Sequence, residues 1–448
     1  MLSVRAFAVS LLVLLPLHAS VIGVSKPAES LTQARVMALP TAQRGPWLDY
    51  LKRSAEQMRA DKAVLSAERM AMKKIPPLPK QHFSARSIPL HRAPEFYRSD
   101  EARHIGDVIL SFQTAAGGWS KNLDMSGPAR LRGQSYATAN LAPVSSSAGD
   151  FDEAADESWH YVGTLDNDAT NTELHFLAEL SAALPGREGD AYRTSFLRGI
   201  EYLLQAQFPN GGWPQVWPLE GGYHDAITFN DDAVTESAEV LTLAAKGGRV
   251  AESQQAIEDY SFVPAALRVR AKMAAAKALA CILATQVRVP ADDGKGTVLT
   301  VWAQQHDPLT LAPVAARNFE PAALSSGESA SVMEYLMSLD RPSPAVVRSV
   351  DAAAAWFEAH RVMGYTWSGG RDTAGGRKLT NAPGAGPLWA RYYSLTTGKP
   401  IFGDRDKTIH DDVMEVSLER RNGYAWYGSG QEKTLQAYAE WKSAHTAK

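Results

Sequence analysis

From about residue 95 onward, apolar residues recur at helical spacing, and stretches rich in glycine, proline, asparagine and aromatic residues separate the apolar segments. One helix face follows the spacing i, i+4, i+7, i+8, in Phe196, Ile200, Leu203 and Leu204. Further helices are expected at 172–184, 233–246, 265–286, 329–339, 345–361, 386–396, 409–418 and 430–444. Because the alternation typical of strands is scarce, the pattern predicts an all-α protein with long aromatic-rich loops.

Two of the predicted helices end in the same motif. A helix over 105–112 leads into Gln113-Thr-Ala-Ala-Gly-Gly-Trp119, and the helix containing Ile200 leads into Gln207-Phe-Pro-Asn-Gly-Gly-Trp213. The shared ending indicates an internal repeat of helix hairpins. Such hairpins can close into an α/α toroid, in which the loops before the parallel inner helices meet on one face.

The N-terminus begins with Met1-Leu-Ser-Val-Arg5 and continues with an apolar run that ends at Leu17. This run is too short to span a bilayer as a helix, and small residues follow it, which is typical of a secretory signal peptide over 1–20 rather than a membrane anchor. We therefore expect an exported protein, periplasmic or secreted, whose mature form has no membrane segment. Residues 21–90 are expected to form an N-terminal helical arm and linker before a main domain at 91–448.

Charge and composition exclude several classes of protein. The 448 residues include 46 Lys and Arg against 49 Asp and Glu, which gives no support to a nucleic-acid binder with a basic surface. An apolar content of 45% excludes a disordered chain. The single cysteine, Cys281, lies on an apolar helix face and is interpreted as structural.

Acidic residues stand directly before two of the predicted helices. Thr170 and Glu173 fit a capping box, which places Asp166, Asn167 and Asp168 in the preceding loop. Capping would use one or two of these side chains, whereas the full set also suits a hard cation such as Ca²⁺, and both interpretations stay open. Asp231 and Asp232 precede the next inner helix in the same way, and we expect Asp231 to lie near Asp166. In that segment, His224 is either a base or a loop residue.

Three arginines have neighbours that indicate a role. Arg317 lies among small and aromatic residues, where a partly buried guanidinium needs an anionic partner. Arg391 stands beside aromatic residues and Arg405 between two aspartates, so either could pair internally or bind a carboxylate ligand with its two-nitrogen fork. Tyr424 follows in an aromatic turn, where its ring either contacts a sugar or packs against the preceding helix. The whole set points to an anionic sugar polymer.

At these residues the sequence resembles the family 10 polysaccharide lyases, which are pectate lyases with an (α/α)₃ toroid. The resemblance covers roughly 95–445 and depends on seven motifs in order: Gly117-Gly-Trp-Ser-Lys-Asn122, Thr164-Leu-Asp-Asn-Asp-Ala-Thr170, Gly211-Gly-Trp-Pro-Gln215, Ile227-Thr-Phe-Asn-Asp231, Trp302-Ala-Gln-Gln-His-Asp307, Leu388-Trp-Ala-Arg-Tyr392 and Gly398-Lys-Pro-Ile-Phe-Gly-Asp-Arg-Asp406.

The resemblance implies cleavage of polygalacturonate by Ca²⁺-assisted β-elimination, which leaves a 4,5-unsaturated product. By motif position it makes Arg317 the base that removes the C5 proton. It also implies a metal and essential-acid role for Asp166, Asn167 and Asp231. The substrate-binding residues would be Arg391, Arg405, Lys121 and Tyr424.

Two other functions are compatible with the residues. An inverting glycoside hydrolase would use Asp166 and Asp231 as acid and base, separated by ~6.5–9.5 Å with a water between them. A non-catalytic receptor for uronate oligosaccharides would use the same arginines and rings without turnover. The loops at 126–159 and 246–260 look expanded, and we expect them to shape the rim of the cleft.

Overall fold

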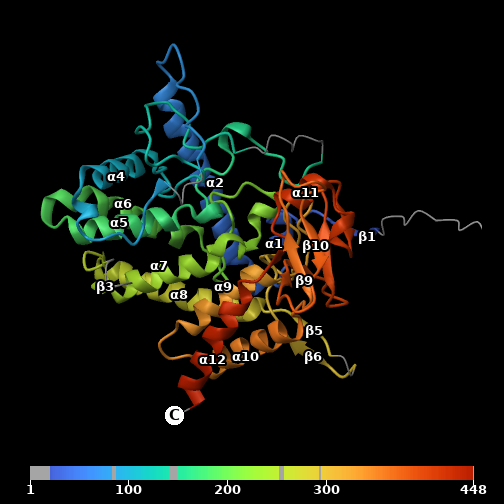
Figure 1. Ribbon diagram of the computed structural model, residues 1–448. Helices are drawn as coiled ribbons and strands as arrows, with labels where there is room; N and C mark the ends of the chain where they lie inside the picture. Colours follow the sequence, from blue (N-terminus) through green and yellow to red (C-terminus); the bar gives the residue numbers. More distant parts are fainter. Residues whose placement is uncertain (1–20, 83–86, 141–148, 252–256, 292–293, 447–448) are drawn as a thin grey trace, which may run out of the picture.

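The computed structural model describes residues 21–82, 87–140, 149–251, 257–291 and 294–446. Most of the main body is a stack of helices, with many of the short strands at one end of the stack (Figure 1). The helices of the stack are α4 (Asp100–Phe112), α5 (Asn171–Ala183), α6 (Asp190–Ala206), α7 (Ala233–Lys246), α8 (Ala265–Thr285), α9 (Ser326–Met337), α10 (Pro344–Ala359) and α12 (Gln431–Thr446).

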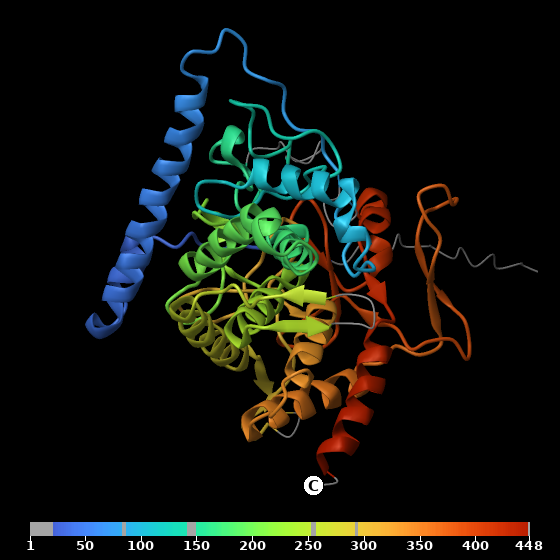
Figure 2. The same cartoon turned by 90° about the vertical axis from the view of Figure 1, so that its left-hand side faces the viewer.

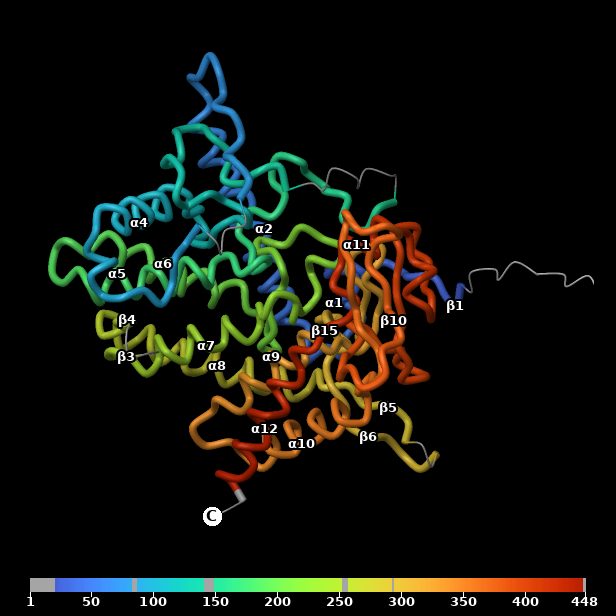
Figure 3. The backbone as a smooth tube through the Cα atoms, in the orientation of Figure 1, coloured from blue at the N-terminus to red at the C-terminus, as the bar shows by residue number. Residues whose placement is uncertain are grey.

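These helices form two series. In the first series α5 contacts α7, α7 contacts α9 and α9 contacts α12, whereas in the second α4 contacts α6, α6 contacts α8 and α8 contacts α10. Each helix of one series also packs against a helix of the other, as in α4 with α5 and α7 with α8. The path of the chain through this arrangement can be followed in Figure 3. The predicted repeat of helix hairpins is therefore present, and its closure into a toroid stays a prediction.

The prediction of an all-α fold was too narrow, because the described residues also form small antiparallel sheets. The largest has the strand order β1-β14-β13-β12-β8, and the others have two strands each. The strands are β1 (Val21–Val24), β2 (Ile227–Thr228), β3 (Arg249–Ala251), β4 (Ile257–Asp259), β5 (Arg288–Pro290), β6 (Thr297–Leu299), β7 (Gln305–His306), β8 (Leu324–Ser325), β9 (Tyr365–Ser368), β10 (Lys378–Asn381), β11 (Trp389–Ala390), β12 (Tyr392–Tyr393), β13 (Pro400–Gly403), β14 (Thr408–His410) and β15 (Tyr427–Gly428).

Two predicted helices were wrong. The segment 386–396 contains strands β11 and β12, and 409–418 contains the end of β14 and a 3₁₀ turn at Val413–Glu415, before a short helix α11 at Leu418–Gly423. Trp389 and Ala390 are both buried, as are Tyr392 and Tyr393. A short apolar run that is buried on every side has no period that separates a strand from a helix. Moreover, β12 pairs with Leu324 and Ser325, which are distant in sequence.

The N-terminal segment packs against the main body. Strand β1 pairs with β14, and after the short helix α1 (Gln33–Met37) the long helix α2 (Thr41–Arg69) runs along one flank of the stack (Figure 2). The Tyr50 hydroxyl donates to the Ala206 carbonyl at 2.9 Å, and its ring packs on Phe208. The domain boundary at residues 90 and 91 stays a prediction, and the predicted signal peptide at 1–20 lies outside the described residues.

None of the described helices is both long enough and apolar enough to cross a membrane.

Buried tryptophans join each loop to the helix before it. Each indole N–H donates to a main-chain carbonyl of a helix at 2.7–2.9 Å: Trp119 to Ile109, Trp213 to Leu203, Trp302 to Ile282 and Trp389 to Phe357. All four side chains are fully buried. The Gly-Gly-Trp motif seen in the sequence is therefore part of a larger structural repeat, in which one tryptophan fixes the end of each hairpin.

Steric constraints explain why the first position of the Gly-Gly-Trp motif is a glycine. Gly117 and Gly211 have φ angles of 105° and 101°, which side chains rarely tolerate. A Cβ atom would also lie 2.4 Å from the Arg198 carbonyl oxygen at Gly117, and 2.2 Å from the Lys277 carbonyl oxygen at Gly211. In both copies the glycine thus lets the turn touch the backbone of the next helix in the second series.

We expect Trp213→Phe to lower the free energy of unfolding by about 1–3 kcal/mol, because it leaves the buried Leu203 carbonyl without its indole donor. Trp441→Phe is the matched control, since the buried Trp441 indole nitrogen has no acceptor among the described residues. Urea unfolding followed by circular dichroism measures both changes. Equal losses in the two variants would show that the indole hydrogen bond contributes nothing to stability.

Candidate functional site

Two 3₁₀ turns hold the acidic residues of the site. Asp166–Asp168 leads into α5, and Asn230–Asp232 leads into α7. Both turns contain adjacent residues with left-handed backbones, at Asn167 and Asp168 (φ 52° and 61°) and at Asp231 and Asp232 (φ 48° and 55°). This conformation is unfavourable for residues other than glycine, and it is concentrated at functional sites in proteins. The two repeats therefore place strained acidic turns side by side.

The carboxylates do not cap helices. Asp166 accepts hydrogen bonds from Lys121 Nζ at 2.5 Å, from Gln215 Nε2 at 2.6 Å and from Asn230 Nδ2 at 3.1 Å. Asp231 Oδ2 accepts from the Asn167 main-chain N–H at 2.9 Å and from Asn230 Nδ2 at 2.7 Å. These bonds join the two turns to each other and to Lys121.

The helix start near residue 171 was predicted correctly, but the capping box was wrong. The side chain of Thr170 makes no capping hydrogen bond. Its hydroxyl instead donates to the Thr164 carbonyl at 2.8 Å and accepts from the main-chain N–H of Trp119 at 3.1 Å. Thr170 thus holds the loop of Asp166 against the Gly-Gly-Trp turn.

The two carboxyl groups affect each other strongly. Burial, followed by the negative charge of Asp166, raises the pKa of Asp231 to about 8. Burial also disfavours charge on Asp166, but Lys121 outweighs this effect and lowers the pKa of Asp166 below its ordinary value. Two close carboxyl groups with this much negative potential favour a bound cation, and carboxylate and amide oxygens are the donors that Ca²⁺ prefers. Asp166, Asn167 and Asp231 therefore fit a Ca²⁺ site.

Arg317 is paired with a glutamate that the sequence analysis did not single out. Arg317 Nε and Nη2 donate to the two carboxylate oxygens of Glu320 at 2.9 and 2.6 Å. The arginine side chain is 41% exposed, whereas that of Glu320 is 2% exposed. Burial disfavours the charged guanidinium, but Glu320 outweighs it and raises the pKa of Arg317 above its ordinary value. Burial opposes ionisation of Glu320 as well, yet Arg317 lowers the pKa of Glu320 to about 2.

A continuous series of hydrogen bonds connects this pair to the acidic cluster. Tyr424 donates to Glu320 at 2.6 Å, and its hydroxyl lies 2.7 Å from that of Tyr392. Tyr392 donates to Gln304, and Gln304 donates to Asn230 at 3.0 Å. Since Asn230 also bonds Asp166 and Asp231, residues before α5, α7, α9 and α12 belong to one network.

Arg391 lies over the ring of Tyr424. Its guanidinium carbon is 4.7 Å from the ring centre, and Nη2 donates to Glu328 at 2.5 Å. Arg391 and Tyr424 line a cavity of about 470 Å³ together with Arg371 and Arg377. Three arginines and one aromatic ring in an open cavity suit a ligand that carries carboxylates.

Arg405 joins the same region through Phe319. It pairs with Glu419 through Nε at 3.0 Å and Nη2 at 3.2 Å, and its side chain is 29% exposed. The Phe319 ring contacts three guanidinium groups, those of Arg317 at 5.0 Å, Arg405 at 5.3 Å and Arg420 at 4.2 Å. The structure thus brings every residue predicted for the site into one region, although each arginine already has a carboxylate partner within the protein.

The sequence analysis missed the groups that connect these residues, namely Gln215, Asn230, Gln304, Glu320, Glu328, Tyr392 and Glu419. Several lie within the quoted motifs, and Glu320 stands three residues after Arg317. The one available signal was therefore membership of a motif. Their partners come from other hairpins, and sequence spacing does not contain that information.

The comparisons with known proteins identify the family of the chain. The model of the pectic acid lyase family matches residues 113–435. The family 10 polysaccharide lyase from Cellvibrio cellulosa is 30% identical with a TM-score of 0.60, over 78% of this chain and 94% of its own. An aspartate-to-alanine mutant of that lyase, in complex with trigalacturonic acid, is also 30% identical with a TM-score of 0.61, over 78% and 95%.

No curated protein shows a significant match to the sequence. The family match spans most of the chain and includes the acidic turns, the Arg317–Glu320 pair and the aromatic turn at Tyr424. The chain therefore belongs to the pectic acid lyase family and is a pectate lyase.

Proposed function

We propose that this protein cleaves polygalacturonate by Ca²⁺-assisted β-elimination after export from the cell. The observation that carries the proposal is the single hydrogen-bonded network that joins a carboxylate pair to Arg317 and to the ring beneath Arg391. A polyuronate is the polymer that needs both a cation site and guanidinium groups along one cleft. The two helix series would then be the layers of the expected (α/α)₃ toroid.

Asp166, Asn167 and Asp231 would hold the Ca²⁺ ion. Bound Ca²⁺ would neutralise the uronate carboxylate beside the reacting carbon and so stabilise the negative charge that develops when the C5 proton leaves. Lys121 keeps Asp166 ionised for this role, and Asn230 orients both carboxylates through one amide nitrogen.

Arg391 and Arg405 would bind carboxylates of the substrate. The ring of Tyr424 would pack against a sugar, and Lys121 would contact the substrate near the bound cation. The cavity lined by Arg391, Arg371 and Arg377 supports this assignment. The complex of the Cellvibrio lyase mutant with trigalacturonic acid supports the same class of substrate.

Arg317 would be the base. In the reaction the C5–H electrons form the C4=C5 double bond, the C4–O bond breaks, and the leaving oxygen takes up a proton. The pairing with Glu320 keeps the guanidinium protonated in the resting site, which opposes this role at neutral pH. The role therefore requires alkaline conditions.

The two alternatives have less support. One amide nitrogen of Asn230 reaches Asp166 at 3.1 Å and Asp231 at 2.7 Å. These oxygens are consequently closer than the ~6.5–9.5 Å between the carboxylates of an inverting hydrolase. A passive receptor would need neither the strained acidic turns nor a partly exposed arginine held by a buried glutamate.

The first test is the reaction itself. With polygalacturonate and Ca²⁺, we expect ultraviolet absorbance to increase as the conjugated double bond forms, to stop on chelation and to resume when Ca²⁺ is restored. Arg317→Ala should lower kcat by roughly 10²–10⁴-fold, the usual contribution of general base catalysis. New reducing ends without absorbance would indicate hydrolysis, and binding without product would indicate a receptor.

A second prediction concerns pH. Glu320→Gln removes the carboxylate that raises the pKa of Arg317, so a larger fraction of the arginine is neutral at a given pH. If Arg317 is the base, the rising alkaline limb of the kcat profile should move to lower pH by roughly 1–3 units.

The matched control is Glu419→Gln, because Glu419 forms the same two-point pair with Arg405. We expect this variant to raise KM and to leave the alkaline limb in place. If Glu320→Gln lowers the maximal kcat but leaves the pH of the alkaline limb unchanged, Glu320 positions Arg317 and another group is the base.

A third prediction concerns substrate binding by Arg391. Lysine keeps the charge but lacks the planar fork, so Arg391→Lys should raise KM for polygalacturonate roughly 10-fold, with a smaller change in kcat. Arg270→Lys serves as control, since Arg270 forms a two-point pair with Glu201 between α6 and α8. Steady-state kinetics distinguishes them, and similar KM values for both variants would exclude a substrate contact at Arg391.

A further inference from the structure

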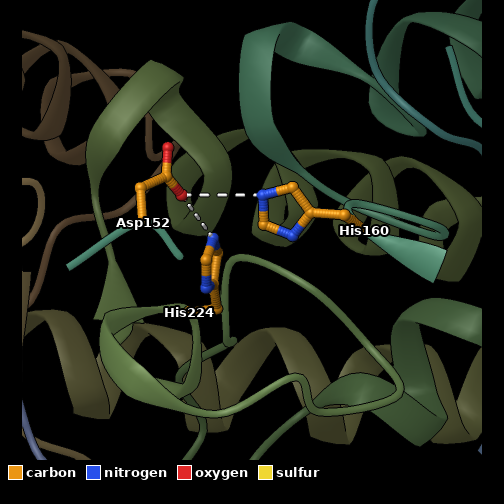
Figure 4. Close-up of side chains that lie close together, drawn as sticks. All are labelled: Asp152, His160 and His224. Atoms are coloured by element: carbon orange, nitrogen blue, oxygen red, sulfur yellow. Dashed lines mark ion pairs between the residues drawn. The ribbon is translucent and has the colours of Figure 1, made fainter. Parts of the chain in front are cut away.

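A second cluster of metal-binding side chains lies beside the site. Asp152, His160 and His224 each direct one ligand atom toward the others, and these three atoms lie within 4.8 Å of one another. Asp152 Oδ1 is 3.3 Å from His224 Nε2 and 3.7 Å from His160 Nε2. Figure 4 shows both imidazole rings pointing a nitrogen at that one oxygen. The cluster joins the loop before α5 to the turn at Gly222–Asp225.

The Nε2 atom of each histidine is buried and faces the Asp152 carboxylate. His160 and His224 are each 4% exposed, and neither Nε2 has a hydrogen-bond partner of acceptable geometry among the described residues. The carboxylate oxygen that they face already accepts hydrogen bonds from Tyr161 at 3.0 Å and Tyr223 at 2.6 Å. The distances from the two nitrogens to this oxygen, 3.3 and 3.7 Å, are longer than those of a well-formed N–H···O hydrogen bond.

The ring of His160 is oriented as in a metal site. Its other nitrogen, Nδ1, is 2.8 Å from Glu220 Oε2, and Glu220 Oε1 accepts from the main-chain N–H of Tyr161 at 2.6 Å. A carboxylate at Nδ1 keeps a proton on that nitrogen, so Nε2 is the atom that would bind a metal after losing its own proton. Metal-bound histidines commonly have this carboxylate partner, which fixes the tautomer and makes the ligand more basic.

We propose that Asp152, His160 and His224 bind a divalent transition metal of the Zn²⁺ type. Tetrahedral Zn²⁺ with bonds of about 2.0–2.1 Å places neighbouring ligand atoms about 3.3 Å apart, close to the two measured distances of 3.3 and 3.7 Å. Two imidazoles and one carboxylate select such a metal over Ca²⁺, which takes oxygen ligands.

Without a metal, the occupant of the cluster is a proton. Burial disfavours charge on His160, but Asp152 and Glu220 outweigh it and raise the pKa of this histidine to about 9. A metal must displace that proton, so binding is best measured at pH 8 or above.

The metal would have a positioning role. It would tie Asp152, in the loop that looked expanded in the sequence, to the two histidines beneath it. The ring of Tyr161, next to His160, lies 3.3 Å from Lys121 Nζ, and Lys121 bonds Asp166. The cluster is therefore connected to the acidic turn through Tyr161 and Lys121.

The test uses the untagged full chain, stripped by chelator and then dialysed against Zn²⁺ at pH 8 in the presence of millimolar Ca²⁺. We expect one Zn²⁺ per chain by elemental analysis and a higher Tm than in Ca²⁺ alone. Co²⁺ in place of Zn²⁺ should give the visible absorption of a low-coordinate cobalt site with histidine ligands. That spectrum is measured on the unaltered protein and does not depend on whether a variant folds.

Single substitutions identify which residues bind the Zn²⁺ ion. His224→Gln should lower Zn²⁺ affinity at least 100-fold, and Glu220→Gln roughly 10–100-fold through the orientation of His160. His104→Gln is the control, because His104 is an exposed residue of α4 whose ring contacts the Gly127 carbonyl at 2.9 Å; the Zn²⁺ affinity of this variant should not change. Absence of bound Zn²⁺, displacement of Zn²⁺ by Ca²⁺, or loss of Zn²⁺ in Asp166→Asn but not in His224→Gln would each overturn the proposal.

Discussion

The structure of the site depends on the close approach of two buried carboxylates, those of Asp166 and Asp231. Burial, together with the negative charge of Asp166, raises the pKa of Asp231 to about 8, so the protein needs compensating groups around the two carboxyl groups. Lys121 supplies a charge, and Asn230 supplies an amide that bonds both carboxylates. The resulting set of carboxylate and amide oxygens is of the kind that Ca²⁺ prefers.

The helix repeat provides the means to build such a site. A tryptophan anchored to the preceding helix and a glycine against the next one hold each loop in place. The loops before successive helices of the first series then each contribute a residue to the site: Asp166 before α5, Asp231 before α7, Arg317 before α9 and Tyr424 before α12. The hydrogen-bond network through Gln304 and Tyr392 connects these loops.

Much of this arrangement could be predicted from the sequence, because helix periodicity and the order of motifs are local properties. The helices at 171–183 and 233–246, and the proximity of Asp166 to Asp231, follow from them. The strands at Trp389–Tyr393 could not be predicted, since their pairing partners at Leu324 and Ser325 are remote. The roles of Glu320 and Asn230 could not be predicted for a related reason. These roles depend on hydrogen bonds to partners from other hairpins, and a polar residue in a loop is too common to indicate such a role by itself.

The positions of the arginines show how a chain with little net charge can still have a local cationic site. A formal net charge of -3 excludes a uniformly basic surface, yet Arg317, Arg391 and Arg405 each carry a partly exposed guanidinium that is paired with a carboxylate of the same chain. The internal partner fixes the direction of the fork, and the exposed side remains open to a second anion. A near-neutral protein can therefore present a local group of cations to a polyanion, and some of its acidic residues are needed to orient those arginines.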